Sequence, residues 1–161
     1  MATSREWVLL AYRIPREPST PRIAVWRKLR RLGVVQILDG LVGLPHDART
    51  KEHLEWIADE VLEAGGEASI FLAHPSTKAH ERALAAQMAD EIDAQYDAIV
   101  DDAKSARSAS DVDRRRTHAR LGRELKAVRN RDHFPKRGFE RARAAVQQLG
   151  ESLGDEISAR R

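Results

Sequence analysis

The run VVQILDGLVGL at residues 34–44 decides the fold. It holds two short apolar segments, 34–38 and 41–44, separated by Asp39 and Gly40. An Asp-Gly pair between apolar runs is the strongest short-range indication of a β-hairpin, because both residues of the favoured turn must accept a positive φ. This stretch therefore predicts two antiparallel strands joined by a tight turn.

A strand and a helix precede the hairpin. Residues 7–14 are rich in strand-forming side chains and stop at a proline. Ser19-Thr20-Pro21 then supplies a hydroxyl cap followed by proline at the first helical position. The helix is expected to run to Gly33, a residue suited to the left-handed conformation that ends helices.

After the hairpin we expect a helix from about Ala48 to Gly65, followed by a strand over residues 67–73. The resulting order, strand–helix–strand–strand–helix–strand, is that of the split βαβ or ferredoxin-like arrangement. Right-handed crossovers place both helices on one face of a four-stranded antiparallel sheet. Because an open apolar sheet face would aggregate, the opposite face must be covered by the rest of the chain or by a second copy. We therefore expect an α+β, ferredoxin-like domain over residues 1–75.

The remainder, residues 76–161, shows helical periodicity only. Apolar residues at steps of four and three predict a long helix over 77–106. Ser110 and Asp111 can cap a second helix over about 113–132, and apolar residues from Phe139 onward indicate a third. We expect a three-helix, all-α region packed on the first domain.

The composition excludes several classes of protein. With no cysteine among 161 residues, the chain cannot form a disulfide scaffold, a thiolate zinc site or a cysteine nucleophile. The six histidines are scattered without the i, i+4 spacing of a zinc helix, so no metal or other cofactor is expected. Without a signal-peptide core or an apolar run of about 20 residues, the expected location is the cytoplasm, with no membrane partner.

An enzymatic function is not expected. The chain has neither a glycine-rich phosphate loop nor a GxSxG nucleophile elbow. Small ferredoxin-like nucleases that use two metal ions keep a catalytic aspartate at the end of the first strand, where this chain has Arg13-Ile14-Pro15.

The net charge of +3 is unevenly distributed. Residues 1–75 are neutral, residues 76–110 carry −3, and residues 111–161 carry +6. Fold stability does not require that segregation, and it creates a local positive potential that attracts phosphate.

Two helices concentrate the basic residues. On the helix over 113–132, arginines lie opposite a stripe of leucine and valine, and the first helix has four basic residues among five positions. Guanidinium groups bind phosphate through paired donors, so such faces can follow a nucleic-acid backbone. The candidate nucleic-acid-binding residues are Arg27, Lys28, Arg30, Arg31, Arg114, Arg115, Arg116, Arg120, Arg123 and Arg131.

Two structural alternatives remain open for these arginines. Those of the later helix can pair with acidic residues of the helix before it, such as Glu91, Asp97 and Asp101. Those of the first helix can shield Trp26 and the sheet edge by snorkelling. The three tryptophans, Trp7, Trp26 and Trp56, lie within strand or helix patterns and are predicted to be core or interface residues.

Two segments resemble a known family. Residues 26–33, WRKLRRLG, followed by Asp39-Gly40-Leu41 and Leu44-Pro45, are similar to the start of chromate-resistance protein B (ChrB). Residues 129–134, RNRDHF, resemble the segment that precedes that family's final helix. Both patterns occur in order across nearly the whole chain.

The resemblance implies a bacterial transcriptional regulator module that binds double-stranded operator DNA as a dimer in chromate-resistance operons. Longer members carry a C-terminal domain associated with the chromate response, and from the end at Arg161 we expect this chain to lack that domain. The alternative is a protein-interaction module that pairs with a separate sensor or transporter. In that case the arginines only maintain solubility.

Overall fold

The computed structural model describes residues 5–159, and its contacts divide the chain into two compact units, Met1–Met88 and Ala89–Arg161. The expected domain boundary, between residues 75 and 76, marks the start of the helical region. The division between the two units lies inside a long helix, whose first turns belong with the sheet.

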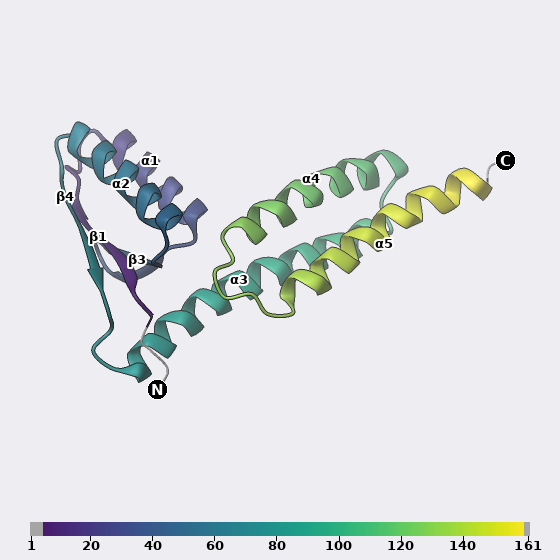
Figure 1. Ribbon diagram of the computed structural model, residues 1–161. Helices are drawn as coiled ribbons and strands as arrows, with labels where there is room; N and C mark the ends of the chain where they lie inside the picture. The colour runs from purple at the N-terminus through teal and green to yellow at the C-terminus, as the bar shows by residue number, and fades with distance from the viewer. Residues whose placement is uncertain (1–4, 160–161) are drawn as a thin grey trace. The chain divides into compact units, whose positions relative to one another are not determined.

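The first unit is an α+β structure with a four-stranded antiparallel sheet, as predicted (Figure 1). The sheet has the strand order β2-β3-β1-β4, and α1 and α2 lie on the same face of it. Val8 and Leu10 of the central strand are fully buried in the layer between sheet and helices. The elements are β1 (Trp7–Arg13), α1 (Ser19–Leu32), β2 (Val35–Leu38), β3 (Leu41–Pro45), α2 (Ala48–Glu63) and β4 (Glu67–Ala73).

The hairpin forms at Asp39 and Gly40, but only the glycine has a positive φ, of 75°. The expectation that both turn residues adopt a positive φ is therefore wrong. Gly40 is required for a second reason, because a Cβ there would lie 2.5 Å from the backbone oxygen of Tyr12. The Tyr12 N–H in turn donates to the Gly40 carbonyl at 2.8 Å, which fixes the turn against β1.

The helix ends follow the sequence in part. Gly33 ends α1 with φ 73°, as predicted, but the hydroxyl cap is wrong: α1 begins at Ser19 itself, after Pro18, and has no side-chain cap bond. Helix α2 has a capping box, in which the Asp47 carboxylate accepts from the Thr50 N–H and the Thr50 hydroxyl accepts from the Asp47 N–H.

The second face of the sheet is covered in part by the start of α3 (Lys78–Ala106). Trp7 of β1 and Leu84 of α3 are both buried and line one apolar hollow of about 280 Å³. Phe71 of β4 lies on the same sheet face opposite Leu9 and stays 54% exposed. The chain's own helix therefore covers one end of this face and leaves β4 open.

The second unit consists of the remainder of α3 together with α4 (Asp111–Asn130) and α5 (Gly138–Ala159). Ser110 caps α4, as predicted, by accepting from the Asp113 N–H. Gly150 of α5 allows α4 and α5 to approach closely, because a Cβ at this position would lie 2.8 Å from the His118 ring of α4. The buried core comprises Ile92, Tyr96, Ile99, Ala103, Ala106, Leu121, Val128, Ala142, Val146 and Leu149. No helix in residues 5–159 is long and apolar enough to cross a membrane.

Candidate nucleic-acid interface

Helix α4 presents three of its arginines on the side opposite its buried stripe. Leu121 and Val128 are buried in the core, with Leu125 packed against them. Because an α-helix has 3.6 residues per turn, Arg115, Arg116 and Arg123 lie on the opposite side, and all three are exposed to solvent. None of these three side chains has an ion pair or hydrogen bond to another residue within 5–159. We call this set of three the α4 basic surface.

The other candidates on α4 are engaged within the chain. Arg120 pairs with Asp102 of α3 at 3.2 Å and with Glu124 at 3.1 Å. Pairing of α4 arginines with acids of the preceding helix, the structural alternative raised by the sequence, therefore occurs at Arg120. The predicted acid Asp97 pairs instead with Arg141 of α5, at 2.9 Å.

Arg114 and Arg131 are held more firmly. Arg114 is only 6% exposed and forms an ion pair with Asp111, so its guanidinium does not face solvent. Arg131 donates from Nε and Nη2 to the Gln95 side-chain oxygen, at 2.8 and 2.5 Å. Sequence periodicity missed this difference, because the partners are set by helix packing and by the end of α4.

Helix α1 carries a second basic surface, on the other compact unit. Arg27, Arg30 and Arg31 are exposed, and we call them the α1 basic surface. Lys28 lies on the side toward α2 and forms an ion pair with Glu60, so it differs from its neighbours. The Arg30 guanidinium carbon lies 5.0 Å from the centre of the Trp26 ring, a cation–π contact.

The three tryptophans differ in burial. Trp7 is a core residue, as predicted. Trp26 and Trp56 are 51% and 58% exposed, so assigning them to the core would be wrong; the interface part of that prediction stays open. Arg30 covers Trp26 in part, which agrees with the snorkelling alternative, whereas Trp56 contacts the His53 ring at a centroid distance of 5.8 Å.

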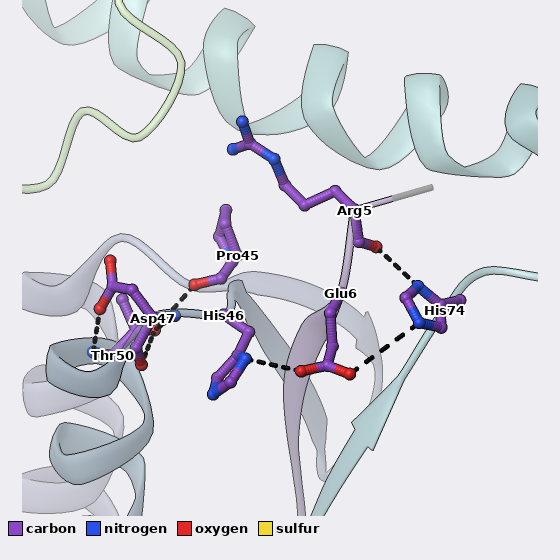
Figure 2. Close-up of polar contacts among 7 residues, drawn as sticks. All are labelled: Arg5, Glu6, Pro45, His46, Asp47, Thr50 and His74. Carbon is purple, nitrogen blue, oxygen red and sulfur yellow. Dashed lines mark hydrogen bonds and ion pairs between the residues drawn. The ribbon is translucent and has the colours of Figure 1, made fainter. Parts of the chain in front are cut away.

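A polar cluster at one end of the sheet was not anticipated from the sequence (Figure 2). The Glu6 carboxylate lies between two histidines, 2.7 Å from Nδ1 of His46 and 3.9 Å from Nε2 of His74. His74 also contacts the Arg5 carbonyl through Nδ1 at 3.2 Å. These residues are far apart in the sequence, so no local pattern could find them.

The cluster ties the start of β1 to the ends of β3 and β4. The Thr50 hydroxyl adds a bond from α2 to the Pro45 carbonyl at 2.7 Å. In the part of the chain that the structure describes, no group of three or more His, Cys, Asp or Glu side chains is arranged to hold a metal ion. Because the contacts of Glu6, His46 and His74 join the start of β1 to the ends of β3 and β4, we assign the cluster a structural role.

The segment RNRDHF at residues 129–134 also has structural contacts. The guanidinium of Arg129 lies 4.0 Å from the centre of the Phe139 ring. The Tyr96 hydroxyl donates to Oδ2 of Asp132 at 3.1 Å. Burial, and then the nearby Asp132 carboxylate, raise the pKa of Tyr96 above its usual value, so the phenol stays a neutral donor. The segment thus fastens the end of α4 to α3 and α5.

Comparisons with known proteins agree with the two sequence patterns. The family described as "Protein ChrB, N-terminal" matches residues 22–157. The chain is 29% identical over 140 residues to Protein ChrB of Cupriavidus metallidurans (strain ATCC 43123 / DSM 2839 / NBRC 102507 / CH34). That alignment covers 84% of this chain and 43% of the longer relative. No solved structure matches.

Proposed function

Because the chain belongs to the ChrB N-terminal family, we propose that it is a non-enzymatic, DNA-binding module of a chromate-resistance regulator. The observation that supports this most is the α4 basic surface. Its three guanidinium groups are exposed and have no partner within residues 5–159, although acidic side chains neutralise neighbouring arginines on the same helix.

These side chains have the chemistry to bind phosphate. Arginine presents its donors in a planar fork that matches two phosphate oxygens. A guanidinium without an internal ion pair can bind DNA without first losing a carboxylate partner, so Arg115, Arg116 and Arg123 are favoured over Arg120. On the first unit, Arg27 and Arg31 are favoured over Lys28 for the same reason. Arg114 does not belong to the interface, because its side chain is buried.

We infer that the first unit is ferredoxin-like. The element order β1-α1-β2-β3-α2-β4 and the sheet order β2-β3-β1-β4 support this assignment, and α3, α4 and α5 support the proposal of a three-helix region after it.

A dimer fits the sheet. β4 is an edge strand of seven residues with Phe71 and Leu72 exposed, and an unpaired apolar edge is a template for a second strand. We therefore expect a second copy to pair along β4. In sedimentation velocity, Leu72→Lys should produce monomers, whereas Leu38→Lys, at another exposed leucine, should not. Monomeric unsubstituted protein would refute the dimer.

The experiment that tests the function is a comparison of two DNA duplexes. One is the promoter region upstream of the gene for this chain, and the other is a scrambled duplex of equal length and composition. A specific regulator binds its own site at least about 1,000-fold more tightly than other DNA at physiological salt. Equal affinity for both duplexes would rule out a sequence-specific regulator.

The second candidate function is a protein-interaction module that pairs with a separate sensor or transporter. The exposed apolar side chains Trp56 and Leu62 on α2 favour it, because they offer contact area for a partner. Two results together would select this function. One defined partner would co-purify with the unsubstituted protein and with Arg116→Gln but not with Trp56→Ser, and salt-dependent DNA binding would be absent.

A further inference from the structure

A pocket of about 580 Å³ lies between the hairpin turn, the end of β1 and the outer side of α1. That volume is within the range of about 300–1,000 Å³ usual for small-molecule sites. The whole pocket lies in the first unit, and its walls differ in chemistry. It is lined by Tyr12, Arg13, Ile14, Arg22, Ile23, Trp26, Gln36, Asp39 and Gly40.

One wall of the pocket is apolar and aromatic. Ile23 and Trp26 are one turn apart on α1 and both line the pocket, although they are 42% and 51% exposed. Large apolar side chains are usually buried in the core. Two adjacent, exposed ones that line the same pocket, such as Ile23 and Trp26, are therefore unusual for a solvated helix face. A flat ring placed against Trp26 would bury apolar area and stack on the indole.

The other walls supply a neutral donor, two arginines and one carboxylate. Tyr12 lies half-buried in the pocket, and burial, followed by the charge of Asp39, raises the pKa of its phenol, which therefore stays protonated as a donor. Arg22 has no ion pair to any carboxylate in residues 5–159, whereas Arg13 is paired with Glu67 at 2.6 Å. The Asp39 carboxylate accepts from the Gln36 amide at 3.4 Å.

We propose that this pocket binds a planar aromatic group that carries a negative charge. Trp26 and Ile23, which are exposed, would contact the aromatic part of the ligand. Arg22 and the phenol of Tyr12 would donate hydrogen bonds to its negatively charged group. Two sources share this chemistry, an aromatic carboxylate and a nucleotide. The inference goes beyond the proposed function, because none of the lining residues belongs to the α1 or α4 basic surface.

The test is calorimetric titration of the full chain, without DNA, with matched probes. 2-Naphthoate carries ring and charge, 2-naphthamide carries the ring alone, and cyclohexanecarboxylate carries the charge alone. Loss of one charge-assisted hydrogen bond weakens binding by about tenfold, so 2-naphthoate should bind about tenfold more tightly than either analogue. Adenosine 5′-monophosphate against adenosine forms the nucleotide arm, and the tighter anion of the two arms identifies the source.

Variants locate the binding. Arg22→Gln and Trp26→Leu should each weaken the tighter anion at least about fivefold. Arg49→Gln and Trp56→Leu remove the same chemical groups from exposed positions outside the pocket, and should change the affinity less than about twofold. The proposal is overturned if neither anion binds more tightly than its neutral analogue, or if the control variants weaken binding as much as the pocket variants. Either failure leaves the DNA-binding proposal unaffected, because no DNA is present.

Discussion

Removal of the α4 basic surface should reduce the salt dependence of DNA binding more than removal of three other arginines from the same unit. The test variant changes Arg115, Arg116 and Arg123 to glutamine. The matched control changes three exposed arginines that already have polar partners within the chain, so the loss of formal charge is identical. These are Arg107, which donates to Gln148, Arg141, which pairs with Asp97, and Arg143, which pairs with Glu140.

The size of the effect follows from the number of free guanidinium groups. Each phosphate contact on duplex DNA contributes about −0.9 to the slope of log K against log salt. Three lost contacts should therefore make the slope less steep by about 2.7. Between 50 and 200 mM salt, the unsubstituted protein should lose about 40-fold more affinity than the test variant. The control variant should shift the slope by less than about 1, because its arginines are held by internal partners.

The assay is fluorescence anisotropy of a labelled promoter duplex at five or more salt concentrations, with circular dichroism to verify the fold of each variant. Equal shifts for both variants would mean that DNA responds only to net charge. An unchanged slope for the test variant would mean that Arg115, Arg116 and Arg123 do not contact phosphate. Either result would refute the assignment of this surface.

Two further predictions concern stability, measured by urea denaturation. Gly40→Ala and Gly65→Ala both place a side chain at positive φ, which costs about 1–2 kcal/mol, but only at residue 40 does the new Cβ also meet a backbone oxygen. Gly40→Ala should therefore lower the free energy of unfolding clearly more than Gly65→Ala, and equal losses would contradict the tight packing of the turn against Tyr12. Tyr96→Phe should cost about 1–2 kcal/mol through loss of the bond to Asp132, and an unchanged midpoint for the second unit would show that this bond contributes nothing.

The fold could be predicted from sequence where local rules decide it. The Asp-Gly turn, Gly33 at the end of α1 and the apolar period of α3 depend on a few neighbouring residues, and the structure confirms the elements they indicate. The predicted hydroxyl cap of α1 failed because the helix already starts at Ser19, two positions before Pro21, which was expected at the first helical position. The core alternative for Trp26 is wrong because helical period cannot distinguish the edge of a buried face from its centre.

The candidate site could be predicted only as a set of charges. Periodicity identified which helices are basic, but the difference between Arg116 and Arg120 depends on Asp102, which lies 18 positions away from Arg120 on another helix. The burial of Arg114 depends on packing in the same way. The pocket beside Trp26 combines three segments that are separate in the sequence, so no local pattern could indicate it.

Helix α3 runs without interruption through the boundary between the two compact units. A fragment cut between Met88 and Ala89 would therefore begin or end inside a helix, with four backbone N–H or carbonyl groups deprived of their intrahelical acceptors or donors. Expression of the helical unit alone should succeed better from residue 77, where the Thr77 hydroxyl already accepts from the His80 N–H, than from residue 89. Neither unit therefore has a helix end at the division between Met88 and Ala89.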